Sequence, residues 1–203
     1  MPQIENNTMF KISYGLFVLT AKMGEKNNGC IINTVQQLSQ GPLKISVAVN
    51  KDNYTHDMIK ATGEFNVSVL TENTPFSVFE RFGFQSGRDA DKFLGFGETM
   101  ASENGILYLT KYSNSFISGK VVEEVDCTSH TLFIAEVTEA KVLSDERSVT
   151  YQYYHENIKP KPEKVKKSGY VCKICGYVYE GDPLPQDFVC PLCKHGAADF
   201  EKL

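Results

Sequence analysis

Four cysteines in two CxxC pairs constrain the C-terminal end of this chain more than any other sequence feature. Cys172 and Cys175 form the first pair, and Cys190 and Cys193 form the second. Each CxxC spacing bends the backbone into a tight turn that points two sulfur atoms toward one place. Two such turns facing each other make a tetrahedral set of thiolates, the geometry preferred by zinc and by iron. The pattern therefore predicts a metal site and leaves the metal open.

Disulfides are the alternative interpretation of the same cysteines. A domain stapled by disulfides usually belongs to a secreted chain. The segment 1–5 lacks the basic and apolar regions of a signal peptide. No apolar run approaches a membrane span, because Lys22 soon follows the run from Leu16 to Leu19. We therefore expect thiolate ligands in a cytoplasmic protein that does not bind membranes.

Length and composition fit one domain of ordinary size joined to a much smaller one. The chain has 203 residues, of which 41% are hydrophobic and 23% charged, as in globular proteins. Prolines and lysines in 158–169 predict a stiff, solvated linker, and solubility explains these lysines better than docking. We expect domains at 1–157 and 170–203, the smaller one needing a metal to fold. The net charge of -4 gives no indication of nucleic-acid binding.

The large domain has the pattern of a mainly β fold with short helices. Gly63 is expected to end a helix over 55–61, and Pro75 to begin one over 75–82. The Asn28-Gly29 pair predicts a hairpin turn over 25–29. Many short strands with only two helices favour an antiparallel barrel or sandwich over a doubly wound sheet. The predicted strands are 16–20, 30–35, 44–49, 65–70, 117–125, 131–142 and 149–154.

Two further cysteines and a group of aromatic residues receive structural interpretations. Cys30 and Cys127 are expected to be small buried hydrophobic residues. Tyr153, Tyr154 and His155 are expected to pack as part of the last strand. The glycine-rich stretch 83–97 predicts a loop of the kind that often carries function over a barrel mouth.

A possible anion site lies where the strand 44–49 runs into the first helix. A helix start offers free backbone N–H groups and the positive end of the helix dipole. Lys51 adds a positive charge there. Asn53 and Thr55 can either cap the helix or donate to an anion. From these residues alone, capping and phosphate binding both remain open.

The C-terminal residues resemble a rubredoxin. The resemblance rests on Cys-x-x-Cys-Gly-Tyr-x-Tyr at 172–179 and Cys-Pro-x-Cys at 190–193. The stretch between the pairs is shorter than in free-standing rubredoxins and is similar to the module fused to rubrerythrins. The resemblance implies one iron ion in place of zinc. The aromatic residues around both pairs agree with iron, because shielding sulfur from water helps to set a redox potential.

Several blocks of the large domain resemble the flavin reductase-like, FMN-binding split-barrel family. The blocks are 29–39, 46–51, 63–70, 81–93 and 129–137. The resemblance implies an antiparallel, Greek-key type split β-barrel that forms a homodimer, with one FMN per subunit near the interface. It implies that the flavin ring and ribityl chain are lined by Asn33, Thr34, Val35 and Gln36. It places around the ribityl chain and phosphate Asn50, Lys51, Asn53, Thr55 and His56, with Lys92 as a further cation.

The same resemblance implies that His130 lies close to the isoalloxazine ring. A lone histidine at a strand start is otherwise more often a hydrogen-bonded part of the scaffold. No pair of nucleophile and base stands out, so no catalytic side chain is predicted. The Gly95-Phe96-Gly97 stretch lacks the full Rossmann fingerprint, because Met100 stands at its last glycine position. NAD(P)H stays possible, since split-barrel reductases can stack the nicotinamide directly on the flavin.

Together the two resemblances imply an electron-transfer oxidoreductase. NAD(P)H would reduce FMN, and the four-cysteine iron would pass the electrons to an external acceptor. The implied acceptor is a flavodiiron protein that removes oxygen or nitric oxide in anaerobes. Two alternatives remain: a flavin reductase with a structural zinc ribbon, and a non-enzymatic electron carrier that a separate partner reduces.

Overall fold

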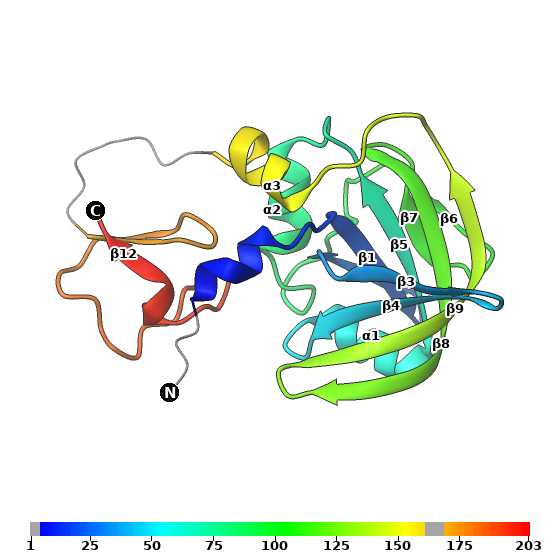
Figure 1. Ribbon diagram of the computed structural model, residues 1–203, viewed down its shortest axis with the longest axis horizontal. Helices are drawn as coiled ribbons and strands as arrows, with labels where there is room; N and C mark the ends of the chain where they lie inside the picture. Colours follow the sequence, from blue (N-terminus) through cyan, green and yellow to red (C-terminus); the bar gives the residue numbers. More distant parts are fainter. Residues whose placement is uncertain (1–4, 161–168) are drawn as a thin grey trace. The chain divides into compact units, whose positions relative to one another are not determined.

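Strands make up most of the regular structure in the computed structural model, which describes residues 5–160 and 169–203 (Figure 1). The predicted mainly β fold class is confirmed. Contacts between residues divide the chain into two units, one ending at Ile158 and the other beginning at Lys159. Most of the predicted linker, 161–168, lies outside the described residues. No helix in the described ranges is long and apolar enough to cross a membrane.

A seven-stranded antiparallel sheet forms the framework of the first unit (Figure 1). The strand order is β2-β1-β5-β8-β9-β4-β3. Every pair of neighbours is antiparallel. The strands are β1 (Phe17–Met23), β2 (Lys26–Ile32), β3 (Val35–Gln40), β4 (Leu43–Asn50), β5 (Glu64–Leu70), β8 (Ser113–Cys127) and β9 (His130–Val142).

The sheet must curl into a barrel because its two edge strands are consecutive in the chain. Only Asn33 and Thr34 separate the end of β2 from the start of β3. Three peptide units span about 11 Å at most, so Ile32 and Val35 lie close together at the two edges. No backbone ladder joins β2 to β3 among the described residues. The barrel is therefore split where these two residues lie.

Alternating residues of β1 feed two separate cores on the two faces of the sheet. Leu19 and Ala21 lie in the core that includes Met58 and Ile59 of α1 (Tyr54–Thr62). Val18 lies in the other core, with residues of α2 (Phe76–Gly83). This alternation follows from the two-residue period of a strand. Full burial of each such side chain contributes roughly 1.5–3 kcal/mol.

The two predicted helices are confirmed, with ends shifted by one residue. Gly63 ends α1 in the left-handed region, at φ 73°, and its N–H donates to the Ile59 carbonyl at 2.8 Å. A glycine adopts this conformation without steric cost, which makes it a good helix stop. Pro75 precedes the first residue of α2.

A short hairpin that we did not predict covers part of the sheet. It consists of β6 (Thr99–Ala101) and β7 (Leu107–Leu109). Asn66 Nδ2 donates to the Ile106 carbonyl at 2.9 Å, and Thr20 Oγ1 donates to the Leu107 carbonyl at 2.6 Å. These bonds join segments far apart in the sequence, so a local pattern did not reveal the hairpin.

The predicted turn over 25–29 is wrong. Met23 pairs with Lys26, so the chain reverses at Gly24 and Glu25, and Asn28 and Gly29 lie within β2. The Asn28 amide is buried and donates to Thr55 Oγ1 at 3.0 Å. Tertiary contacts to this side chain therefore outweigh the local turn preference of Asn-Gly. The predicted strand 30–35 is likewise split, because β2 ends at Ile32 and β3 begins at Val35.

The predicted strand 149–154 is also wrong, because no strand forms over these residues. Val149 is buried and Thr150 makes an isolated bridge to Gly15. The chain then forms α3 (Tyr151–Tyr153) and a π-helix over Tyr154–Ile158. The Thr150 side chain accepts from the Tyr153 N–H at 3.1 Å and so caps this helical segment. The aromatic residues at 153 and 154 are therefore helical.

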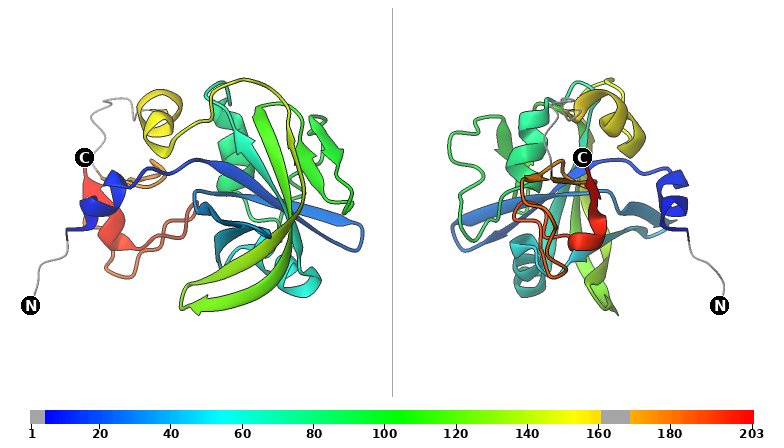
Figure 2. Two further views of the ribbon diagram at one scale, coloured as in Figure 1. Left: turned by 45° about the vertical axis from the view of Figure 1, so that its right-hand side comes forward. Right: turned by 90° about the vertical axis from the view of Figure 1, so that its left-hand side faces the viewer.

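Two further elements complete the first unit: a 3-10 helix over Asn6–Lys11 and the outer part of the β8–β9 hairpin. Figure 2 shows this hairpin continuing beyond the strands beside it. Its tip carries Cys127, which is exposed, so the predicted burial of this thiol is wrong. Cys30 is buried as predicted.

The second unit has a three-stranded antiparallel sheet in the order β11-β10-β12. Its small core combines cysteines with Phe200 and partly buried aromatic residues. So small a core supplies little stability by itself. Its elements are β10 (Tyr170–Cys172), β11 (Val178–Tyr179), a 3-10 helix (Ala197–Asp199) and β12 (Phe200–Lys202).

Candidate functional site

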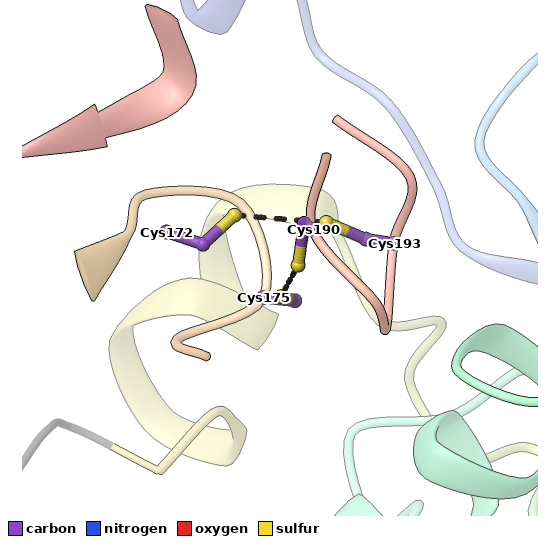
Figure 3. A group of neighbouring side chains, drawn as sticks. All are labelled: Cys172, Cys175, Cys190 and Cys193. Carbon is purple, nitrogen blue, oxygen red and sulfur yellow. Dashed lines mark hydrogen bonds between the residues drawn. The ribbon is translucent and has the colours of Figure 1, made fainter. Parts of the chain in front are cut away.

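The four cysteines of the CxxC pairs form one cluster (Figure 3). Their four Sγ atoms all lie within 4.8 Å of one another. The Sγ atoms of Cys172 and Cys193 are 3.6 Å apart, and those of Cys175 and Cys190 are 3.4 Å apart. A tetrahedron with metal–sulfur bonds of 2.3 Å requires about 3.8 Å between sulfurs. The thiols are free, and their spacing fits a four-coordinate metal.

The two cysteine turns have the same backbone construction. The Gly176 N–H donates to the Cys172 carbonyl at 2.8 Å, and the Lys194 N–H donates to the Cys190 carbonyl at 2.9 Å. Gly176 has φ 81° and Lys194 has φ 63°. This left-handed residue after each pair aims the next N–H at a sulfur: Tyr177 toward Cys175 and His195 toward Cys193. Such N–H groups stabilise thiolates.

The thiols differ in how readily they ionise. Burial raises the pKa of Cys175 to about 11 and also raises the pKa of Cys193. Burial opposes ionisation of Cys190 as well, but the N–H groups of Cys193 and Leu192 and the Cys175 thiol together lower its pKa. Cys190 is therefore the thiol most readily deprotonated among these three. A metal that takes all four thiolates must displace protons.

Aromatic rings surround the cluster. Phe188 lies 4.6 Å from Tyr179 between ring centroids and meets Phe200 edge-on at 5.3 Å. Tyr177 stacks on the same Phe188 ring at 6.4 Å. This shell shields part of the cluster from water, since Cys172 and Cys190 are buried while Cys175 and Cys193 are half-buried. Such shielding is one of the ways in which a protein tunes an iron–thiolate centre.

The residues predicted to contact a flavin come mostly from strands that lie side by side. Asn50 at the end of β4 pairs with His130 at the start of β9. The Lys51 N–H donates to the Ser129 carbonyl at 3.0 Å. Thr34 Oγ1 donates to the carbonyl of Ala48 on β4 at 2.7 Å. These contacts link the split of the barrel to the end of β4 and the start of β9.

The neighbours of Thr34 have different environments. Val35 packs partly buried against the core that contains α1. Gln36 is exposed, and its amide donates to the Gln37 carbonyl at 3.3 Å. Val35 and Gln36 pair with Val47 and Ser46 of β4. Asn33 lies between β2 and β3, so its backbone is not part of the hydrogen-bond ladders of these strands.

The start of α1 retains the features of an anion site. Asn53 occupies the N-cap position, yet its side chain makes no capping hydrogen bond. Its N–H donates to the Asn50 carbonyl at 3.0 Å, and Asn50 Oδ1 accepts from the Asp52 N–H at 2.8 Å. The capping interpretation of Asn53 therefore has no support in the structure. The helix end at which it lies is of the kind that attracts anions.

Thr55 and His56 are buried on α1 and hold the helix to the sheet. Thr55 Oγ1 accepts from Asn28 Nδ2 at 3.0 Å. His56 Nε2 lies 2.8 Å from Thr131 Oγ1, and its ring lies 5.6 Å from that of Phe133. These contacts fix the position of the α1 start relative to β2 and β9.

The two predicted cations have different surroundings. Lys51 is partly exposed and forms an ion pair with Asp126 at 2.8 Å. Lys92 is only 3% exposed, and its ammonium donates to the carbonyls of Gly29 at 2.8 Å and Phe82 at 3.0 Å. Burial lowers the pKa of Lys92. Its ammonium therefore holds the loop that follows α2 against β2.

Two cations that we did not predict lie beside the first residue of α1. Lys26 Nζ is 4.7 Å from the centroid of the Tyr54 ring, and the Arg88 guanidinium is 5.1 Å from it. Arg88 also pairs with Asp57 at 2.5 Å and lowers the pKa of that carboxyl. Neither cation follows a local pattern, because β2 and the glycine-rich loop reach α1 only in the folded chain.

Known protein families account for both units. The model of the flavin reductase like domain matches residues 9–161. The chain belongs to the flavin reductase-like family. In this family member, residues 170–201 also match the rubrerythrin, rubredoxin-like domain. Both resemblances found in the sequence are thereby confirmed.

This family member is similar to a relative over both of its parts. The present chain is 36% identical to the high molecular weight rubredoxin of Moorella thermoacetica, over 98% of this chain and 100% of that protein. It is 41% identical to the ferric-chelate reductase (NAD(P)H) of Archaeoglobus fulgidus, over 72% of this chain and 86% of that protein.

A solved structure confirms the predicted fold of the first unit. The NADH:FAD oxidoreductase SgcE6 of Streptomyces globisporus superposes with a TM-score of 0.66 at 18% identity. The match covers 74% of this chain and 92% of that chain. The sequence identity is low, so this likeness concerns the fold.

Proposed function

We propose that this flavin reductase-like protein is an oxidoreductase that takes electrons from NAD(P)H and delivers them to an external acceptor through FMN and a four-cysteine iron site. When bound, FMN holds the two electrons of a hydride and the iron carries one at a time. The observation that carries the proposal is the cluster of four Sγ atoms within 4.8 Å, in a chain whose other unit has the flavin reductase fold.

We infer that the four cysteines hold iron and shield one side of it from water. Cys172 and Cys190 are buried, while Cys175 and Cys193 are half-buried. The N–H groups of Tyr177 and His195 point at the two half-buried sulfurs. These donors offset part of the negative charge that four thiolates bring together. The site thus has a built-in route for electrons on its half-buried side.

We propose that the start of α1 binds the FMN phosphate. The uncapped Asn53 amide and the helix dipole supply hydrogen bonding and positive potential. Lys51 and Arg88 lie beside this end, while Thr55 and His56 fix it in place. We propose Lys92 as a cation that sets the local potential from its buried position.

The flavin ring, in this proposal, lies at the split of the barrel. Asn33, Thr34, Val35 and Gln36 would line it on one side, with Asn50 and His130 on the other. Among the described residues no backbone ladder joins β2 to β3, so in this proposal the flavin pyrimidine ring would pair with backbone groups of these edge strands. The same proposal includes a homodimer with the flavin near its interface and a cytoplasmic location. It also includes domains at 1–157 and 170–203, joined by the linker 158–169.

Anaerobic stopped-flow spectroscopy with NADH and with NADPH tests the proposal. We expect flavin bleaching to be followed by loss of the iron–thiolate colour in the same chain. If the flavin bleached while a confirmed iron site stayed oxidised, the relay would be wrong. A flavin that stayed oxidised with both donors would instead identify a carrier that a separate partner reduces. A zinc-containing preparation that shows flavin absorption but no iron–thiolate absorption would identify a structural ribbon.

For the acceptor, we propose a flavodiiron protein that reduces oxygen or nitric oxide. The test is consumption of either gas by a purified flavodiiron protein with NADH and this chain. We expect turnover to require the intact metal site, so Cys175→Ser should stop it. Equal turnover with the variant would show that the metal unit does not take part in electron transfer to the flavodiiron protein.

A second candidate function is reduction of ferric chelates. It is favoured by the 41% identity of the flavin unit to a ferric-chelate reductase (NAD(P)H). Ferric citrate reduction by NADH, compared between the unchanged chain and Cys175→Ser, separates the two functions. Equal rates would assign this activity to the flavin unit alone.

A further inference from the structure

Neither of the two cysteine turns contains an acidic residue. The first turn, 172–176, contains Lys173, and the segment 190–195 contains Lys194 and His195. These three side chains are exposed. The positive charge is local, because the segment 170–203 carries five carboxylates outside these turns and only three lysines in all.

Two apolar residues next to the cysteines are also exposed. Val189 is 53% exposed and Leu192 is 42% exposed. Val189 directly precedes the buried Cys190, and Leu192 directly precedes the half-buried Cys193. An apolar area with a polar rim is the common composition of a protein–protein interface. We name Lys173, Val189, Leu192, Lys194 and His195 together the knuckle face.

The two lysines of the knuckle face form no ion pair with another described residue. Among the described residues, neither Lys173 nor Lys194 has a carboxylate within 4.0 Å. By contrast, Lys202 on β12 pairs with Asp182 at 2.7 Å, and Tyr170 donates to the same carboxylate at 3.1 Å. The ammonium groups beside the metal site therefore remain available to a partner.

Lys194 also occupies a backbone position that suits glycine better. Its φ of 63° lies in the left-handed region, where a side chain costs on the order of 1 kcal/mol. The matching position after the first pair is Gly176. Unfavourable backbone conformations of this kind concentrate at functional sites. A lysine at this position, despite its cost, is explained by a use for its charge.

We propose that the knuckle face is the electron exit and docks an acidic redox protein, one whose redox centre lies beneath an apolar patch rimmed by Asp and Glu. Its redox role rests on the proposed function. The positive rim attracts such a partner and orients it. The apolar centre then loses water and brings the partner close to Cys175 and Cys193. A small, transient contact of this type suits repeated electron transfer.

Paramagnetic ions of opposite charge test the surface without any electron flow. The full chain is loaded with zinc, whose four-thiolate site has the same charge as the ferrous one. Amide NMR signals are then recorded with hexacyanochromate(III), an anion, and with tris(ethylenediamine)chromium(III), a cation. We expect the anion to broaden amides of 173–176 and 192–195 selectively, and about 0.5 M salt to suppress this. Selective broadening by the cation, or none by the anion, overturns the proposal.

A charge-reversal pair with a matched control isolates the two lysines. Lys173→Glu with Lys194→Glu should abolish anion broadening at the knuckle face. Lys11→Glu with Lys141→Glu changes the net charge equally on exposed residues of the other unit and should leave the broadening unchanged. If both double variants behaved alike, overall charge would explain the effect and the proposal would fail.

Protein probes test the partner chemistry itself. We expect an acidic flavodoxin to shift the same knuckle amides of the zinc-loaded chain, and a basic cytochrome c to leave them unshifted. Docking of cytochrome c at this face would contradict the proposal. Because zinc(II) is not redox-active, these experiments do not depend on electron transfer from NADH. Failure of the relay and failure of the docking face are therefore distinguishable.

Discussion

Gly176 and Lys194 show how one backbone conformation can serve two purposes. Each follows a CxxC pair, each has positive φ, and each precedes the residue whose N–H points at a sulfur. Glycine adopts this conformation without cost, whereas lysine does not. The second turn therefore has a local strain that the first turn lacks.

A pair of substitutions measures this difference. Lys194→Gly should stabilise the metal unit by about 0.5–1 kcal/mol, and Gly176→Ala should destabilise it by about 1 kcal/mol or more. The midpoint of metal loss in guanidinium, followed by thiolate–metal absorption, reports both. Lys173→Gly is the control, since Lys173 is not one of the described residues with a positive φ. A lower midpoint for Lys194→Gly would contradict the strain argument.

The thiol pKa values predict a steep pH dependence of metal binding. Burial holds the pKa of Cys175 near 11 and raises that of Cys193, so both thiols keep their protons at neutral pH. A metal must displace these protons, so its apparent affinity falls as pH falls. Two displaced protons correspond to about 100-fold per pH unit. Zinc competition with a chelator between about pH 6 and 8 measures the slope, and a flat profile would be inconsistent with protonated thiols.

At the scale of elements, α1 and the helical segment after Thr150 begin in different ways. Asn53 precedes α1 without a side-chain cap, although an asparagine is a good capping residue. Thr150 does cap its segment, through the Tyr153 N–H at 3.1 Å. An element start that leaves its best capping group unused is suited to a ligand.

This contrast gives a matched pair of variants. Asn53→Ala should lower FMN affinity about 10- to 150-fold, because a hydrogen bond to a charged group, worth about 1.5–3 kcal/mol, is lost, and should change apo stability little. Thr150→Ala should cost about 1 kcal/mol of stability and leave FMN affinity unchanged. Thermal unfolding with and without FMN measures both effects. Equal FMN affinity for the Asn53 variant and the unchanged protein would show that the phosphate binds elsewhere.

At the scale of the whole molecule, the two units have separate sources of stability. The first has two apolar cores, one on each face of its sheet. The second has one small cluster in which cysteines are main members. Loss of the metal site should therefore unfold one unit and spare the other.

Cys175→Ser tests this independence. We expect the native iron–thiolate spectrum to disappear while FMN stays bound and the first unit unfolds at an unchanged temperature. Flavin fluorescence and calorimetry provide the measurements. Loss of both cofactors would falsify the separation into units. Retention of the native iron spectrum would exclude Cys175 as a ligand.

The sequence by itself determined what depends on nearby residues. Two CxxC spacings were enough to predict the metal cluster, because each turn is built within four residues. Gly63 and Pro75 marked the ends of helices through their own backbone preferences. The predicted class of fold, which the structure confirms, followed from strand-like runs, most of which form strands.

Tertiary structure decided what depends on distant partners. The Asn28 amide meets Thr55 of α1, so Asn-Gly lies in a strand and the turn falls at Gly24. Lys92 is buried among carbonyls, and Arg88 reaches the start of α1 across the fold. Residues 151–158 coil into helices although they have a strand-like composition. For Asn28-Gly29 a long-range contact outweighs a local turn preference. The contacts of Lys92 and Arg88 join segments far apart in the chain, and local sequence patterns do not reveal them.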